Sequence, residues 1–178
     1  ISEAIEFSNR SSKRVFGYFD HLQFGFEDAP FVVMPPGYGE TKRDALTAAY
    51  YLVRNGFNVL RYDATDHVGE SEGEITNTTM AKLKTDLLSA VDYLDSKFQV
   101  RRVAVIASSL SQRMALKAAA EDQRIGFLLG VVGVVNLRET LKAIYCEDII
   151  GDVAGGKIKD TYDVLGFNID KAYPVSAI

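Results

Sequence analysis

The stretch Arg102-Val103-Ala104-Val105-Ile106-Ala107-Ser108-Ser109-Leu110-Ser111 leads from a predicted strand directly into a predicted helix. Residues 102–107 are rich in valine and isoleucine, which favours a strand buried on both faces of a sheet. Residues 110–120 have the composition of a helix, and the junction between the two elements holds only small residues. A strand that passes straight into a helix is typical of α/β proteins.

Strand-like runs alternate with helix-like segments along the rest of the chain. The clearest helix has Met80, Leu83, Leu87, Val91 and Leu94 at spacings of three or four residues, which places them on one face. The alternation predicts an α/β fold, a mainly parallel sheet with helices on both faces that is incomplete at its C-terminus. The predicted strands are 14–19, 31–34, 57–62, 102–107 and a continuous buried strand 127–135, and the helices are 44–55, 80–94 and 110–120.

The pattern changes after Asn136, where glycine pairs and scattered Asp and Lys residues indicate helices and loops over the sheet. We therefore expect residues 1–136 to form the core of this α/β fold and residues 137–178 to begin a lid or cap insertion. Near the end of the chain, Pro174 precedes a short run that we expect to begin another strand.

The composition indicates one soluble domain and argues against several functions. The chain has 178 residues, of which 47% are hydrophobic, and its 20 basic and 24 acidic residues form no block of one sign, which argues against a nucleic-acid partner. One cysteine, Cys146, and two histidines argue against a disulfide and a zinc cluster. We expect a cytoplasmic protein without metal or other cofactor. The longest apolar run, 125–135, has about half of the ~20 residues that a membrane span needs.

Small residues at the strand-to-helix junction suggest a nucleophile. Ala107-Ser108-Ser109-Leu110-Ser111 resembles the G-x-S-x-G elbow with both glycines replaced by small residues, which the close approach of strand and helix requires. The N-terminus of a helix also offers free N–H groups and a dipole that stabilise negative charge. The alternative is that Ser108, Ser109 and Ser111 only cap the helix.

Two loops after other predicted strands carry further signals. Pro35-Pro36-Gly37-Tyr38-Gly39 follows strand 31–34, where an α/β-hydrolase places the loop with its second oxyanion donor, although an ordinary tight turn is the alternative. The segment from Asp66 to Gly73 follows strand 57–62 and resembles the D-x-x-G-H-G-x-S-x-G loop of α/β-hydrolases. The three segments stand in the order and at the spacing of that fold.

Taken together, these segments resemble a particular family, the acyl-carrier-protein-directed acyl transferases (myristoyl thioesterases) of bacterial bioluminescence operons. The resemblance runs from about residue 12 to residue 142, and residues 134–141 are its most specific part. It implies an acyl-serine intermediate on Ser109, formed from a long-chain acyl thioester without a cofactor. The matching segments are Gly37-Tyr38, Gly56-Phe57, Arg61-Tyr62-Asp63, His67-Val68-Gly69, residues 106–111 and residues 130–141.

The expected mechanism uses Ser109 as the nucleophile and the backbone N–H groups of Leu110 and Tyr38 as the oxyanion hole. Gly37 is expected to let its loop approach the reacting carbonyl. The expected substrate is an acyl thioester of acyl carrier protein or coenzyme A, and other subunits or domains of a fatty-acid pathway are further expected partners.

One part of the machinery is absent from the sequence. The fold orders its triad as Ser, acid, His, yet His21 and His67 precede Ser109 and residues 110–178 hold no histidine. We expect His67 to tie down its loop through backbone hydrogen bonds and His21 to lie in a hairpin turn, and no late acid is assigned. The chain is therefore expected to be a catalytically inert fragment. The alternative is a hydrolase-like module that binds an acyl group or a partner without turnover.

Overall fold

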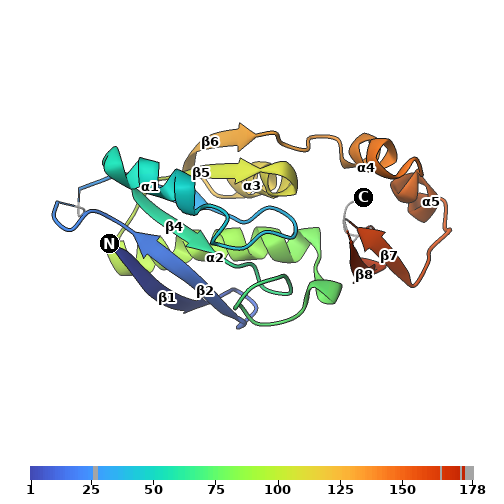
Figure 1. Ribbon diagram of the computed structural model, residues 1–178, viewed down its shortest axis with the longest axis horizontal. Helices are drawn as coiled ribbons and strands as arrows, with labels where there is room; N and C mark the ends of the chain where they lie inside the picture. Colours follow the sequence, from blue (N-terminus) through green and yellow to red (C-terminus); the bar gives the residue numbers. More distant parts are fainter. Residues whose placement is uncertain (26–27, 165, 173, 175–178) are drawn as a thin grey trace.

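A computed structural model describes residues 1–25, 28–164, 166–172 and 174. Its main sheet has the strand order β1-β2-β4-β3-β5-β6 in the described part of the chain (Figure 1). Strands β3 to β6 run parallel to one another, and β1 and β2 form an antiparallel hairpin that joins β4. The strands are β1 Ser2–Ser8, β2 Arg14–Asp20, β3 Phe31–Met34, β4 Asn58–Tyr62, β5 Val103–Ser108 and β6 Ile125–Val131. The mainly parallel α/β sheet is confirmed.

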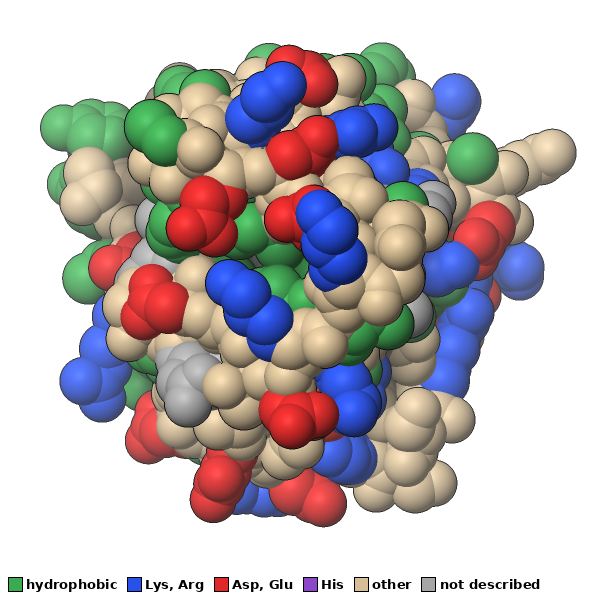
Figure 2. Space-filling model, turned by 90° about the vertical axis from the view of Figure 1, so that its right-hand side faces the viewer, with side chains coloured by type: hydrophobic (Ala, Val, Ile, Leu, Met, Phe, Trp, Pro, Cys, Tyr) green, Lys and Arg blue, Asp and Glu red, His purple; other side chains and the backbone are tan. Residues whose placement is uncertain are grey.

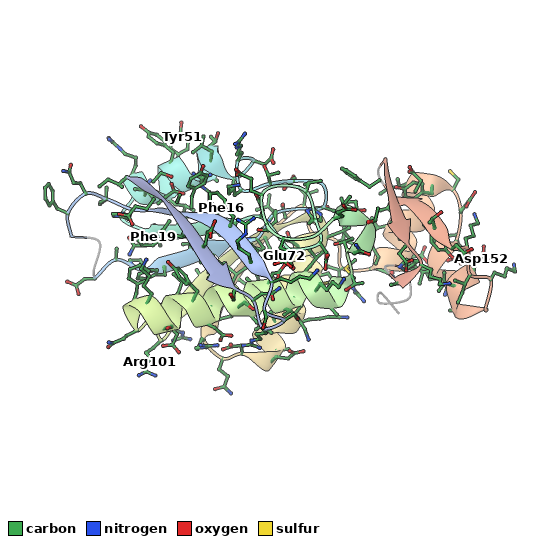
Figure 3. All side chains as sticks on the ribbon, turned by 90° about the horizontal axis from the view of Figure 1, so that it is seen from below. Phe16, Phe19, Tyr51, Glu72, Arg101 and Asp152 are labelled. Carbon is green, nitrogen blue, oxygen red and sulfur yellow. The ribbon has the colours of Figure 1, made fainter. Side chains whose placement is uncertain are left out.

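Helices cover both faces of this sheet, as predicted. Successive residues of β3 contact helices on opposite faces of the sheet, because the side chains of a strand alternate between its two faces. Val33 joins the core against α2 (Met80–Phe98) and α3 (Ser109–Glu121), whereas Val32 packs with Ala49 of α1 (Leu46–Arg54). Seen from below, α2 lies along the sheet, and Phe19 of β2 stacks on Phe98 of α2 with ring centroids 4.9 Å apart (Figure 3).

The helix boundaries follow from local chemistry. Thr79 caps α2, because its side chain accepts a hydrogen bond from the backbone N–H of Lys82 at 3.2 Å. Helix α1 ends before Gly56, whose φ of 84° lies in the left-handed region that glycine adopts without strain. None of the described helices has both the length and the apolar character that a bilayer span requires.

Residues 137–172 lie at one end of the molecule (Figures 1 and 3), and we name them the cap segment after the lid or cap that was expected there. Its elements are α4 (Leu137–Tyr145), α5 (Ile149–Ala154) and the antiparallel pair β7 (Thr161–Val164) and β8 (Phe167–Asp170), and a 3-10 turn, η1 (Ile75–Asn77), contacts β8. Leu137 and Leu141 share a buried cluster with Leu110 and Met114 of α3. At this end of the molecule, acidic and basic side chains are interspersed around hydrophobic ones (Figure 2). The run that follows Pro174, residues 175–178, lies outside the described residues, so the expected strand there is not tested.

The predicted buried strand 127–135 is wrong in both extent and burial. Strand β6 ends at Val131 and pairs only with β5 among the described residues, so it is an edge strand. Phe127 is 66% exposed and Val132 is 91% exposed. Burial on both faces is also wrong for residues 102–107. Val103 and Val105 of β5 are buried, but Ala104 and Ile106 face the thinly covered α1 side and are half-buried.

The predicted hairpin turn at His21 is wrong as well. The hairpin of this region joins β1 to β2 through residues 9–13, and its first strand was not predicted. His21 follows the end of β2, stacks on Phe19 and is only 3% exposed. Because Asp20 pairs with Val59 at the start of β4, His21 lies at the opposite end of the sheet from the strand-to-helix junction.

Candidate active site

The junction between β5 and α3 forces one serine into a strained conformation. Ser108 is the last residue of β5, and Ser109, the first residue of α3, has a φ of 49°. A non-glycine residue in the left-handed region costs roughly 1–2 kcal/mol. A strained serine on a sharp strand-to-helix turn is the geometry that presents a nucleophile in α/β-hydrolases. The Ser109 side chain is half-buried at the carboxyl end of the parallel strands.

The neighbouring serines have other environments. Ser111 is buried, and its hydroxyl donates a hydrogen bond to the backbone oxygen of Ser108 at 2.6 Å, which stabilises the turn. Ser108 occupies the N-cap position of α3, but its side chain makes no capping hydrogen bond. The interpretation of these serines as helix caps therefore fails for Ser108. Leu110, whose N–H is the predicted first oxyanion donor, follows Ser109 in the first turn of α3.

The loop after β3 comes to the same edge of the sheet, because β3 and β5 are adjacent and parallel. Gly37 and Glu40 form a tight turn, in which the Glu40 N–H donates to the Gly37 oxygen at 3.1 Å. The Gly37 N–H donates to Oε2 of Glu40 at 2.9 Å. Tyr38 stands within this turn, and its half-buried ring makes edge contacts with His67 and with Phe167 of β8.

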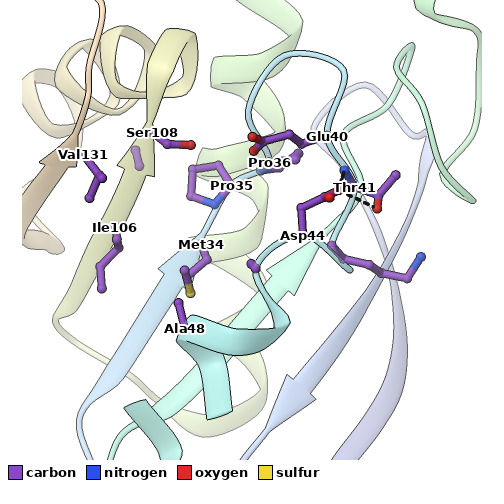
Figure 4. A pocket seen from close by; sticks show the side chains of 13 residues that line it. Met34, Pro35, Pro36, Glu40, Thr41, Asp44, Ala48, Ile106, Ser108 and Val131 are labelled. Carbon is purple, nitrogen blue, oxygen red and sulfur yellow. Dashed lines mark hydrogen bonds between the residues drawn. The ribbon is translucent and has the colours of Figure 1, made fainter. Parts of the chain in front are cut away.

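A cavity of about 240 Å³ lies between this loop and the β5–α3 junction (Figure 4). Pro35, Pro36 and Glu40 line one side, and Ser108 and Val131 line the other. Ser109 stands one residue beyond this lining, at the start of the helix. Gly37, Tyr38 and Leu110 are not among the lining residues either, so the structure brings the loop and the serine turn to one edge of the sheet but does not place the predicted oxyanion donors in the cavity.

His67 is fixed to the loop that holds Tyr38. Its Nε2 accepts a hydrogen bond from the Gly39 N–H at 3.1 Å, and its side chain is buried. The predicted backbone hydrogen bond of His67 is thus present, but it joins His67 to Gly39 in the loop after β3 and not to the backbone of its own loop. Burial lowers the pKa of His67 to about 4, so the imidazole is neutral at pH 7. Among the described residues, no hydrogen bond joins His67 to Ser109.

A buried ion pair behind this loop was not predicted. Lys42 and Asp63 are both almost fully buried, and Lys42 Nζ lies 2.6 Å from Oδ2 of Asp63. The other oxygen of Asp63 accepts the backbone N–H of Lys42 at 2.7 Å, and Oδ2 also accepts the N–H of Glu70 at 2.7 Å. Lys42 Nζ contacts the Glu70 carboxylate and lies over the Phe16 ring, 4.6 Å from its centroid. Asp63 therefore binds both loops that flank the site.

One glycine in the sequence is a signal for the Asp63 side of this ion pair. Gly69 has a φ of 117°, and a side chain there would come within 2.3 Å of the Asp63 carboxylate. The glycine in the predicted hydrolase-like loop is thus required by the close approach of the loop to Asp63. Lys42, in contrast, lies 21 residues before Asp63 in a segment without a recognisable pattern.

Comparison with solved structures identifies the class of fold. The structure of Est1E from Butyrivibrio proteoclasticus with bound ferulic acid has a TM-score of 0.82 to this chain at 21% identity, over 98% of this chain and 71% of Est1E. The α/β-hydrolase GrgF from a Penicillium species has a TM-score of 0.70 at 18% identity, over 97% of this chain and 62% of GrgF. Together with the strained serine turn, these similarities define an α/β-hydrolase fold.

Comparison of sequences identifies the family. A model of the acyl transferase family matches residues 1–172, and the chain belongs to this family. An acyl transferase of Photobacterium phosphoreum is 36% identical over 95% of this chain and 54% of its own length. An acyl transferase of Aliivibrio fischeri is 47% identical over 53% of this chain and 30% of its own length. The chain thus spans about half, or less, of the length of these curated relatives.

Proposed function

We propose that this chain carries the nucleophile of a serine acyl transferase or thioesterase that releases a long-chain acyl group from a carrier thioester. The observation that supports this role best is the positive φ of Ser109 at the β5–α3 turn. Membership of the acyl transferase family supports acyl transfer as the general chemistry. The carrier is acyl carrier protein or coenzyme A, and no cofactor takes part.

In this mechanism, Ser109 Oγ attacks the thioester carbonyl, and the negative charge on the carbonyl oxygen is stabilised by the backbone N–H groups of Leu110 and Tyr38. When the C–S bond breaks, the thiol leaves with the proton that came from the serine hydroxyl. An acyl-serine ester remains, and water or another acceptor then takes the acyl group from it. A general base has to carry the proton between these groups.

The two regions of the chain have different parts in this proposal. Residues 1–136 form the hydrolase core, and the cap segment begins a lid over the acyl group. Phe167 of β8 supports this lid role, because its ring contacts Tyr38 at a centroid distance of 5.9 Å. The buried cluster that joins Leu141 of α4 to Leu110 of α3 also holds the cap segment against the serine turn.

Acylation by a long-chain acyl-coenzyme A, followed by peptide mass mapping, tests the proposal. In the chain joined to the C-terminal part of a family member, which is expected to supply the base, we expect one acyl group on Ser109 and none after Ser109→Ala. Ser108→Ala and Ser111→Ala are matched controls that should keep most of the labelling, because neither side chain takes part in the proposed reaction. The Ser111 hydroxyl only supports the turn, through its hydrogen bond to the Ser108 backbone oxygen. Acyl-enzyme that still forms in Ser109→Ala would contradict the assignment.

A second candidate function is a hydrolase-like module that binds an acyl group or a partner without turnover. It is favoured by one observation, since neither His21 nor His67 makes a described hydrogen bond to Ser109. The same experiment separates the two functions. Saturable binding of the acyl compound without any acylation, even when the rest of a family member is supplied, would favour the binding module.

Gly37→Val should lower the rate of acylation about a hundredfold, which is the usual effect of losing one oxyanion donor. A Cβ at Gly37 would lie 2.4 Å from the Glu40 carboxylate, so valine would displace that side chain and break its hydrogen bond with the Gly37 N–H, which holds the turn before Tyr38. Tyr38→Phe keeps the ring and the backbone donor and should acylate at nearly the rate of the unsubstituted chain. Equal rates of acylation in both variants would show that the oxyanion donor does not come from this loop.

A further inference from the structure

We propose that His67 is a positioning residue for the oxyanion loop, and that its Nε2 lone pair orients the Tyr38–Gly39 backbone by accepting the Gly39 N–H. This inference rests on the proposed function, because it gives the loop after β3 the second oxyanion donor. It assigns His67 a task that differs from that of a general base.

The hydrogen bond fixes the backbone next to the donor. The peptide nitrogen of Gly39 directly follows Tyr38, and it lies 3.1 Å from His67 Nε2. Gly39 has a φ of 77°, a conformation that glycine adopts without strain. A defined acceptor on the Gly39 N–H therefore limits how the preceding peptide, which carries the Tyr38 N–H, can rotate.

The imidazole is suited to accept this hydrogen bond. A neutral histidine has one nitrogen with a proton and one that accepts, so an accepting Nε2 places the proton on Nδ1. Burial of the ring favours this neutral form. Nδ1 is itself buried and has no hydrogen-bond partner among the described residues, so the Gly39 N–H is the polar contact that holds the ring.

The loop is also held from its other side. Phe167 of the cap segment contacts the Tyr38 ring, and a side chain at Gly39 would come within 3.0 Å of the Phe167 ring. Tyr38 in turn makes an edge contact with the His67 ring at 5.5 Å between centroids. His67 and Phe167 therefore clamp the Tyr38–Gly39 backbone between the hydrolase core and the cap segment.

Three substitutions of His67 separate an acceptor role from simple filling of space. His67→Phe keeps a ring beside Tyr38 but removes the acceptor, His67→Gln places an amide oxygen near the position of Nε2, and His67→Asn is polar but too short to reach it. The matched control is His21→Phe, which removes the other buried histidine at the opposite end of the sheet.

The rate of acylation by p-nitrophenyl decanoate is measured over a range of ester concentrations, with the 178-residue chain joined to the C-terminal part of a family member. We expect His67→Phe and His67→Asn to lower the limiting rate about tenfold to a hundredfold with little change in the half-saturating concentration. His67→Gln should recover most of the rate, and His21→Phe should retain it. Hydrogen exchange at the Gly39 amide should speed up in the Phe and Asn variants and stay slow in the Gln variant.

The outcomes distinguish this inference from the proposed function. If Ser109→Ala abolishes acylation but His67→Phe acylates at the original rate, the function stands and the role of His67 is overturned. A His67→Gln variant that is as slow as His67→Phe would overturn it as well, because an acceptor alone would not suffice. If acylation persists in Ser109→Ala, the proposed function fails. The hydrogen bond is tested separately from that function, because an unchanged exchange rate of the Gly39 amide in His67→Phe would show that His67 does not hold this amide.

Discussion

Replacing Lys42 with methionine should lower the free energy of unfolding by about 3–5 kcal/mol, because it leaves the buried Asp63 carboxylate without its counter-ion. Methionine keeps most of the apolar volume of the lysine stem beside Phe16. The two backbone N–H groups that Asp63 accepts cannot replace a full positive charge 2.6 Å away. Urea denaturation followed by circular dichroism measures the difference.

The matched control is Lys157→Met, which removes an ion pair with Asp152 on the surface of the cap segment. Lys157 is 79% exposed and Asp152 is 54% exposed, so this substitution should change stability by at most about 1 kcal/mol. If Lys42→Met were no more destabilising than Lys157→Met, the Lys42–Asp63 pair would not hold the two loops together. The loop with Tyr38 would then have to be fixed by other contacts.

The sequence predicted the elements whose stability is local. Helix α2 was predicted because its apolar residues repeat at helical spacing and Thr79 can cap it, and both causes lie within one element. Strand β1 was missed, because its residues Ser2 to Ser8 are mostly exposed and form a strand only by pairing with β2. The burial of β6 was misjudged for a related reason. A run of valine, leucine and glycine is compatible with a central strand and with an edge strand, and only the neighbouring strands determine which of the two it is.

The candidate site divides in the same way. The strand-to-helix turn was predicted because its small residues are neighbours in the chain, and Ser109 was chosen among its three serines from the family resemblance. The acceptor for Gly39 comes from His67, 28 residues later, and the counter-ion of Asp63 comes from Lys42, 21 residues earlier. Such contacts depend on how two loops meet at the edge of the sheet. These contacts can therefore be predicted only after the order of the strands in the sheet is known.

The 178-residue chain alone should hydrolyse a long-chain thioester at least about a hundredfold more slowly than the same chain joined to the C-terminal part of the Photobacterium phosphoreum relative. General acid–base catalysis contributes about 10²- to 10⁴-fold, and a serine without a base forgoes it. His21 lies at the far end of the sheet, and His67 is neutral with its Nε2 bound to Gly39. The relative extends well beyond the matched region, since the match covers 54% of its length.

The comparison needs a control for association of chains, because β6 is an exposed edge strand in the part of the chain that the structure describes. Phe127, Leu129 and Val131 alternate along this edge strand and are 66%, 57% and 46% exposed, and such a strand promotes association of chains unless it is covered. A joined protein that carries Ser109→Ala should therefore be as monomeric as the active joined protein, yet hydrolyse no thioester. A gain that survives Ser109→Ala would come from the added part alone. If the 178-residue chain turned over as fast as the joined protein, the base would have to lie within this chain, and His67 is the one histidine at the correct edge of the sheet.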